Sequence, residues 1–167
     1  MSELLLSLRG IDKQFPGVRA LTAVSLDVAA GSCHALVGEN GAGKSTLGKI
    51  LAGIYTPDAG VITLAGQPVH FRSPREAHLA GIAMVHQELA LCENLTVAEN
   101  LNLGRLPRRG WLLDRRALEQ RAAEALRDIG ATVPLHSVLA ELPVSQQQLV
   151  QIAGAVAGGA RLLIFDE

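Results

Sequence analysis

A nine-residue segment rich in glycine constrains the fold of this chain more than any other part of its sequence. Residues 38–46, GENGAGKST, fit the pattern G-x-x-x-x-G-K-[ST] without a mismatch. Glycine reaches positive φ at little cost, so consecutive backbone N–H groups can turn toward one anion. The pattern therefore predicts a loop that surrounds the phosphates of a nucleoside triphosphate.

Each residue of the loop has a predicted part in nucleotide binding. The ammonium of Lys44 supplies positive charge to the β- and γ-phosphates, and the hydroxyl of Ser45 is a ligand for Mg²⁺. The helix that follows points the positive end of its dipole at the same phosphates. The predicted nucleotide-binding residues are Gly38, Glu39, Asn40, Gly41, Ala42, Gly43, Lys44, Ser45 and Thr46.

The sequence on both sides of the loop has the context that this motif requires. Residues 33–37 are mostly apolar, which predicts a buried strand with Cys33 in the core. Residues 46–52 begin a helix with Leu47, Ile50 and Leu51 on one side. The order of strand, loop and helix favours a phosphate-binding loop over an ordinary glycine-rich turn.

Composition and charge limit the class of protein. The chain has 167 residues, 49% of them hydrophobic and 19% charged, which is typical of one globular domain. Its formal net charge of −1 argues against a general binder of nucleic acid. A local group of arginines has Trp111 as its one aromatic neighbour for base stacking, so we interpret the group as a solvated loop and helix start. These residues are Arg105, Arg108, Arg109, Arg115 and Arg116.

Cysteine content and hydropathy indicate the compartment. Cys33 and Cys92 are too few for a disulfide framework and lack the spacing of metal ligands, so a reducing compartment is expected. The N-terminus lacks the basic start and the length of a secretory signal. No apolar stretch approaches the ~20 residues needed to cross a bilayer. A role at a membrane therefore requires another polypeptide to span it.

Turn and capping signals divide the rest of the chain into short elements. Strands are predicted over residues 4–11, 18–21, 23–28, 61–64 and 82–85. Ser73, Pro74 and Glu76 have the spacing of a helix start with a capping box.

A helical insert is predicted after residue 95. Thr96 and Glu99 form a second capping box, and Asp114 opens a longer helix that ends before Gly130. Another helix is predicted over residues 147–157. The face of the longer helix that we expect to be buried contains Leu118, Ala122, Ala125, Leu126 and Ile129.

A short apolar segment that ends in two acidic residues supplies the second half of the predicted site. Residues 162–165 predict a buried strand, and Asp166 and Glu167 follow it. A carboxylate held rigidly at the sheet edge can bind Mg²⁺ beside the phosphates. We therefore assign Asp166 to the metal, and Glu167 to the water that attacks the γ-phosphate.

Together these segments resemble the nucleotide-binding domains of ATP-binding-cassette (ABC) transporters over residues 4–167. The resemblance implies an α/β fold of the P-loop NTPase class, with an antiparallel β subdomain and a helical subdomain over about residues 95–158. It places Phe15 where the family keeps an aromatic residue that stacks on adenine. It matches Gln87 to the family's Q-loop glutamine, which touches Mg²⁺ and the attacking water.

The resemblance also implies the cofactors and their ligands. ATP and Mg²⁺ are the expected cofactors. The implied catalytic residues are Lys44, Gln87 and Glu167, and the implied metal ligands are Ser45, Gln87 and Asp166.

Three segments are more narrowly similar to bacterial ATPases that import monosaccharides of the ribose, galactose, arabinose or xylose type: residues 15–21, 37–47 and 86–100. In that branch two cassettes are normally fused, and this chain resembles the first. The implied partners are transmembrane permease subunits, a second cassette and, indirectly, a periplasmic sugar-binding protein, with no nucleic acid. The implied location is the cytoplasmic face of the bacterial inner membrane.

The chain departs from the family pattern at two places. The family signature, usually Leu-Ser-Gly-Gly-Gln, aligns with Leu142-Pro143-Val144-Ser145-Gln146. Pro143 thus replaces the serine that caps the partner's γ-phosphate, and proline has neither a hydroxyl nor an N–H to donate. The family's D-loop and switch histidine come after the position of Glu167 and are absent, so the resemblance implies a truncated cassette that hydrolyses ATP poorly alone.

Two other functions stay open on the sequence. A soluble ABC ATPase of DNA repair or translation predicts a basic nucleic-acid face, which the net charge of −1 does not offer. A nucleotide-binding but catalytically inactive fragment is the second. We favour the ATP-hydrolysing subunit of a sugar importer, which couples hydrolysis to carbohydrate transport.

Overall fold

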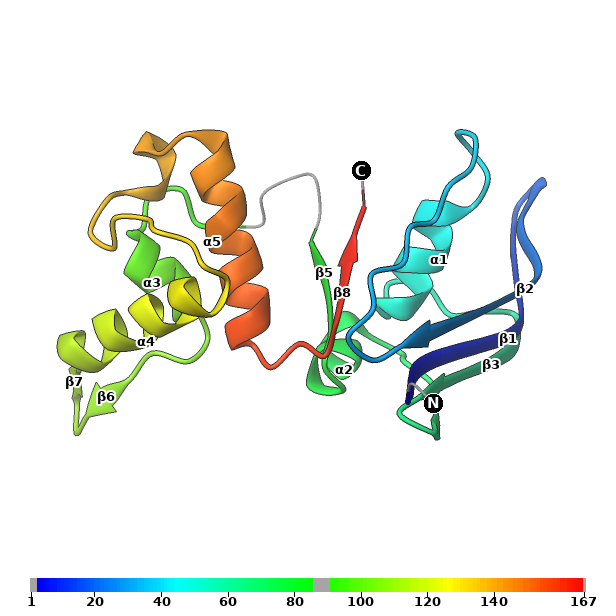
Figure 1. Cartoon of the computed structure of the whole chain (residues 1–167), viewed down its shortest axis with the longest axis horizontal. Coiled ribbons are helices and arrows are strands. Elements are labelled where there is room, and N and C mark those ends of the chain that lie inside the picture. The colour runs from blue at the N-terminus through cyan, green and yellow to red at the C-terminus, as the bar shows by residue number, and fades with distance from the viewer. Residues whose placement is uncertain (1–2, 86–90, 167) are drawn as a thin grey trace. The chain divides into compact units, whose positions relative to one another are not determined.

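The computed structural model describes residues 3–85 and 91–166 of the chain (Figure 1). They form two compact units, Met1–Ala80 and Gly81–Glu167, and each has its own sheet. Among the helices described, none combines the length and the apolar character that a membrane crossing needs.

The first unit is built on an antiparallel sheet with the strand order β2-β1-β3-β4. Its core side chains alternate along the strands, as a sheet with one covered face requires. The fully or nearly fully buried members are Leu6, Leu8 and Ile11 from β1, and Ile62 and Leu64 from β3. The strands are β1 (Leu4–Phe15), β2 (Val18–Ala29), β3 (Ala59–Leu64) and β4 (Gln67–Val69).

Both long strands exceed their predicted lengths because irregular pairing lets the ladder continue. The register of β1 and β2 shifts between Leu8 and Ile11, and pairing then continues to Phe15. The break predicted near residue 22 is a local irregularity inside β2, where Ala23 has a φ of 46°. Bulges of this kind kink a strand without ending it.

Two short helices complete the first unit, α1 (Lys44–Leu51) and α2 (Pro74–Leu79). The predicted inward residues of α1, which are Leu47, Ile50 and Leu51, are buried. At α2 the Ser73 hydroxyl accepts from the Glu76 N–H, and Pro74 occupies the first turn as predicted. The Glu76 carboxylate accepts from the Arg72 N–H rather than from Ser73, so the capping box closes one residue earlier.

The second unit combines a parallel pair of strands with a group of helices. The strands β5 (Ile82–Val85) and β8 (Leu162–Phe165) pair in register from Ile82 with Leu162 to Val85 with Phe165. The helical elements are α3 (Val97–Leu101), α4 (Arg115–Asp128), the 3-10 turn η1 (Leu139–Glu141) and α5 (Val144–Ala157). A small hairpin of β6 (Arg108–Arg109) and β7 (Leu112–Leu113) precedes α4.

The three helices share one apolar core, which includes all the predicted inward residues of α4 except Ile129, which packs half-buried against it. Two buried asparagines connect this core to the backbone. Asn100 bonds to the amide and carbonyl of Cys92, and the Asn102 amide donates to the carbonyls of Ala98 and Leu118. The core members are Val97, Ala98, Leu101, Leu118, Ala122, Ala125, Leu126, Val133, Leu139, Val150 and Ala153.

Two expectations about buried strands are wrong. Residues 33–37 form no strand, Cys33 is exposed, and Val37 is almost fully exposed. A strand requires a hydrogen-bonded neighbour, and none in the described ranges pairs with this segment. Residues 162–165 do form the predicted strand β8, but its side chains are half-buried or exposed, because within residues 3–85 and 91–166 only β5 flanks it.

The predicted capping box at α3 gives a pH test of the helical core. Glu99 accepts from both the N–H and the hydroxyl of Thr96, and these bonds hold the pKa of its carboxyl below the usual value. Because the folded pKa is lowered, the stabilisation is present above the unfolded pKa of about 4.3 and is lost as pH falls through the folded pKa. At pH 7, Glu99→Gln should destabilise by about 1 kcal/mol in urea unfolding followed by circular dichroism.

The difference between Glu99→Gln and the parent should shrink toward zero at pH 3. Glu124→Gln, an exposed carboxylate on α4, is the matched control and should show no comparable loss at pH 7. A loss at Glu99 that persists unchanged at pH 3 would contradict the role given to its charge.

Candidate functional site

The glycine-rich loop leads directly into α1 and is open to solvent (Figure 1). The Ala42 N–H donates to the Glu39 carbonyl over 3.1 Å and closes a turn in the middle of the loop. Gly41 and Gly43 have φ values of 85° and 89°, in the left-handed region that glycine alone adopts cheaply. These dihedrals give the loop its curvature, as the sequence predicts.

Gly43 is also in contact with the strand β2. A Cβ at this position would lie 2.5 Å from the Ala20 carbonyl oxygen and 2.7 Å from Leu21 Cδ2. No side chain fits at those distances. Gly43 therefore fixes where α1 begins relative to β2, and with it the position of the loop.

The first turn of α1 has the features of an anion site. Gly43 is its N-cap and offers no side-chain oxygen, and the first turn contains no acidic residue. The first intrahelical bond runs from the Leu47 N–H to the Gly43 carbonyl over 2.9 Å. The amides of Lys44, Ser45 and Thr46 precede that bond and have no helical acceptor, so they can donate to phosphate oxygens.

The Lys44 side chain folds back over the loop that precedes it. Its ammonium donates to the carbonyls of Gly38 at 2.6 Å and Glu39 at 2.9 Å. An ammonium has three N–H donors, so one remains for a phosphate oxygen. The lysine thus both closes the loop and brings a positive charge into it, without a carboxylate partner among the described residues.

Phe15, the predicted adenine contact, ends β1 and is half-buried. Its ring makes a T-shaped contact with the ring of Tyr55, with centroids 5.2 Å apart, and the Lys13 ammonium lies 5.5 Å from its centroid. Sequence reasoning missed both neighbours. The alternation of a strand could have found Lys13, because residues two apart share a face, whereas nothing local identifies Tyr55.

An acidic turn holds Lys13 in this position. The Asp58 carboxylate accepts from the Lys13 ammonium at 2.8 Å and from the Gln14 N–H at 2.6 Å. The Lys13 ammonium, with the Gln14 amide, lowers the pKa of the Asp58 carboxyl. The turn before β3 is thereby tied to the end of β1 that carries Phe15.

The acidic half of the predicted site lies at the end of the parallel strands in the second unit. Asp166 follows β8, and its N–H donates to the carbonyl of Val85, the last residue of β5, over 3.3 Å. The carboxyl ends of β5 and β8 therefore meet at one sheet edge. Gln87, just beyond β5, and Glu167 lie outside the described residues, so their assignments stay predictions.

The donor chemistry at these positions fits Mg²⁺ bound together with phosphates. Mg²⁺ prefers oxygen and is usually held by one or two protein groups plus substrate phosphates and water. The Ser45 hydroxyl in the first turn of α1 and the Asp166 carboxylate are such groups. Across residues 3–85 and 91–166 no cluster of three His, Cys, Asp or Glu offers a site made of protein alone.

The segment aligned with the family signature forms the start of α5. Pro143 is the N-cap and makes no side-chain cap bond, while its carbonyl accepts from the N–H groups of Gln146 and Gln147. The Gln147 side chain donates to the Leu142 carbonyl at 2.8 Å. These hydrogen bonds order the turn, while Val144 and Ser145 remain exposed to solvent.

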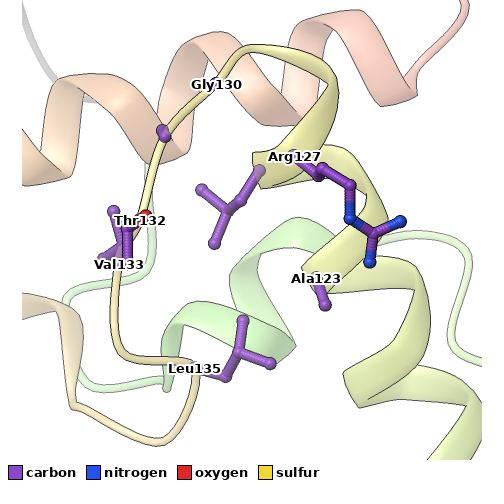
Figure 2. A pocket seen from close by; sticks show the side chains of 8 residues that line it. Ala123, Arg127, Gly130, Thr132, Val133 and Leu135 are labelled. Atoms are coloured by element: carbon purple, nitrogen blue, oxygen red, sulfur yellow. The ribbon is translucent and has the colours of Figure 1, made fainter.

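The second unit also has an open depression at the end of α4 (Figure 2). Its volume is about 420 Å³, and Arg127 is its single charged lining residue. None of the residues predicted for nucleotide or metal binding lines it. The wall consists of Ala123, Leu126, Arg127, Gly130, Ala131, Thr132, Val133 and Leu135.

Comparison with known proteins identifies relatives over almost the whole chain. A family model described as ABC transporter matches residues 21–167. A putative ribose/galactose/methyl galactoside import ATP-binding protein of Agrobacterium fabrum is 51% identical over 97% of the chain, and the ribose import ATP-binding protein RbsA 1 of Rubrobacter xylanophilus is 50% identical over 98%. The arabinose import ATP-binding protein AraG 2 of Burkholderia ambifaria is 52% identical over 98%.

The chain covers 32%, 33% and 31% of these three relatives, so it spans about a third of their length. Solved structures give the same fold. A nucleotide-free ATP-binding cassette from an ABC transporter superposes with a TM-score of 0.80 at 25% identity, over 98% of this chain and 69% of that one. Another ABC transporter cassette gives a TM-score of 0.82 at 25% identity, over 98% and 68%. The expected α/β P-loop NTPase fold is therefore confirmed.

The contact between Gly43 and β2 predicts a severe effect of one added methyl group. Gly43→Ala forces a Cβ against the Ala20 carbonyl and also strains a residue at a φ of 89°, which alone costs roughly 1–2 kcal/mol. Gly66→Ala is the matched control, because Gly66 has a φ of 78° but open space around its Cβ.

Thermal unfolding and binding of a fluorescent ATP analogue should distinguish the two variants. Gly43→Ala should destabilise more than Gly66→Ala and should weaken nucleotide binding at least tenfold, by estimate, whereas Gly66→Ala should leave binding unchanged. Equal effects of the two substitutions on both readouts would contradict the role assigned to Gly43.

Proposed function

Because the chain belongs to the ABC transporter family, we propose that it binds ATP with Mg²⁺ and hydrolyses it as part of a bacterial sugar importer. One observation carries the substrate class. Relatives that are about 50% identical over nearly the whole chain are named as ribose, galactose or arabinose import ATP-binding proteins. Hydrolysis would then be coupled to carbohydrate transport across the inner membrane.

The phosphate loop is the binding element in this proposal. The free amides at the start of α1 and the third donor of Lys44 converge on the β- and γ-phosphates. Phosphoryl transfer to water depends mostly on positioning and on stabilising charge at the phosphate oxygens. A loop curved by Gly41 and Gly43, with the Lys44 ammonium and the first amides of α1 at its end, would supply both.

The metal and the attacking water have their own proposed ligands. Ser45 and Asp166, with Gln87, are the proposed ligands of Mg²⁺, which when bound neutralises developing charge on the phosphates. Glu167 and Gln87 orient the attacking water, and Glu167 accepts its proton. The bond from Asp166 to Val85 supports this assignment, because it joins the ends of β5 and β8, the strands after which these residues come.

Phe15 is the proposed adenine platform. Its ring makes a T-shaped contact with Tyr55 and has the Lys13 ammonium 5.5 Å from its centroid, and these two neighbours would hold the orientation of the ring against a base. Replacing Phe15 with a smaller apolar residue would remove the area that stacks on adenine and would leave the phosphate loop unchanged.

The proposed partners are those of an importer. Transmembrane permease subunits would change conformation in response to ATP binding and hydrolysis. A second cassette, fused or dimeric, would complete each nucleotide site with its signature segment. A periplasmic sugar-binding protein would act indirectly, and the location would be the cytoplasmic face of the membrane. We propose that the helices between Val97 and Ala157 form the helical subdomain of the cassette.

The two alternatives predict different measurements. A soluble ABC ATPase of DNA repair or translation requires binding to nucleic acid, which neither the net charge of −1 nor the names of the relatives favours. A binding-only chain would bind ATP without releasing phosphate. Measuring ATP affinity and phosphate release separately distinguishes these outcomes.

Lys44→Ala tests the phosphate loop directly. The substitution removes a charged donor from a loop whose shape comes from glycine, so the fold should persist while affinity for a fluorescent ATP analogue falls about ten- to hundredfold. Lys49→Ala, five residues later in the same helix, is the matched control and should keep parental affinity. Equal affinities for the parent and Lys44→Ala would contradict the assignment of Lys44 to phosphate binding.

Pro143→Ser tests the composite site formed by α5. A serine at this N-cap restores both a hydroxyl and an N–H, so in an assembly containing two cassettes the substitution should raise ATP turnover several-fold at the site that this turn covers. Pro134→Ser, an exposed proline elsewhere in the second unit, should leave turnover unchanged. No change with Pro143→Ser would mean that another feature limits that site.

A further inference from the structure

The hairpin of β6 and β7, with the turn that joins its strands, is a surface that the nucleotide site does not use. Arg108 pairs with Leu113 and Arg109 pairs with Leu112, which leaves Gly110 and Trp111 as a two-residue turn. Gly110 has a φ of 64°, as the first position of a tight hairpin turn requires. Figure 1 shows the hairpin next to the start of α4, at the edge of the second unit.

The tip of this hairpin is apolar and unprotected. Trp111 is fully exposed, and Leu112 is 76% exposed beside it. Large aromatic side chains are highly buried on average, so a fully exposed tryptophan at a turn is unusual unless something covers it. Leu113 at the end of the hairpin, and Leu103 and Leu106 before it in sequence, are also exposed.

A strong local positive charge accompanies the apolar tip. Residues 103–116 contain five arginines and one acidic residue, Asp114, although the whole chain has a net charge of −1. Asp114 accepts from the Ala117 N–H as the N-cap of α4, and Arg105 donates to the Ala157 carbonyl. The Thr96 N–H and hydroxyl lower the pKa of the Glu99 carboxyl by hydrogen bonding, and Arg115 adds a smaller electrostatic contribution.

The remaining arginines, Arg108, Arg109 and Arg116, are exposed. Within the parts of the chain that the structure describes, none of the three forms an ion pair. Guanidinium groups match phosphate oxygens with two parallel N–H donors. A phosphate-bearing partner would therefore satisfy both the charge and the geometry of this surface.

We propose that the hairpin formed by residues 108–113 docks onto the anionic lipid headgroups of a membrane, with Trp111 and Leu112 entering the headgroup layer. Tryptophan favours that layer because its ring is apolar and its indole N–H is polar. Arginines beside it bind lipid phosphates, and basic groups near an anionic surface each add to the affinity. The proposal concerns a membrane contact by this chain itself and does not depend on nucleotide binding.

The shape of the hairpin favours lipid over other anionic partners. It is a projecting turn with strands of two residues each, too short to extend the sheet of a peptide partner. Binding of single-stranded nucleic acid uses successive aromatic platforms, and this segment has one. A single apolar tip between arginines suits a headgroup layer, which needs no groove and no series of rings.

Tryptophan fluorescence gives a direct test, because Trp111 is the one tryptophan in the sequence. The chain is mixed without nucleotide with vesicles of phosphatidylcholine alone or with one-quarter phosphatidylglycerol. We expect a blue shift of the emission only with the anionic vesicles, and its loss at high salt. An equal shift with both kinds of vesicle, or no shift at all, overturns the proposal.

Two variants assign the binding to the hairpin. Arg108→Gln with Arg109→Gln should weaken vesicle co-sedimentation about tenfold or more, whereas Arg72→Gln with Arg75→Gln, the same charge change in the first unit, should have little effect. Equal losses in both pairs would mean a general charge effect and contradict the proposal. A blue shift with soluble polyglutamate but not with vesicles would overturn it in favour of an acidic protein partner.

Discussion

The approach of Gly43 to β2 is the constraint on which the rest of the candidate site depends. The absence of a side chain lets the backbone pass within contact of the Ala20 carbonyl while φ stays positive. That position determines where α1 begins, and so where its free amides point. It also places Lys44 so that its ammonium can reach back to the Gly38 and Glu39 carbonyls. The positions of the loop's phosphate-binding donors therefore depend on Gly43, where no larger residue fits.

A second set of contacts stabilises the strand end that carries Phe15. Asp58 holds Lys13 and the Gln14 amide, and Lys13 in turn lies over the Phe15 ring. The Asp58 carboxylate is exposed while the Lys13 side chain is largely covered, and an ion pair with one partner open to solvent adds little to stability. The effect of the ion pair is on orientation, because it holds Lys13 over the Phe15 ring, which also contacts Tyr55.

Features that depend on neighbours in sequence could be predicted. The capping box of Thr96 and Glu99 needs residues three apart, and the strand at Ile82–Val85 needs a short apolar run, so both appear where the sequence places them. The segment of residues 33–37 shows the limit, because an apolar run becomes a strand only when another strand offers its hydrogen bonds. For the same reason the contact between Phe15 and Tyr55, distant in sequence, could not be read from either residue.

In the proposed function the loop of residues 38–46 surrounds the phosphates of ATP. An ¹⁵N-labelled chain titrated with MgATP and followed by amide chemical shifts tests this residue by residue. The largest shifts should fall on the amides of residues 41–46, and AMP, which lacks the β-phosphate, should not reproduce them. Shifts of equal size with AMP, or shifts concentrated outside this loop, would contradict the account.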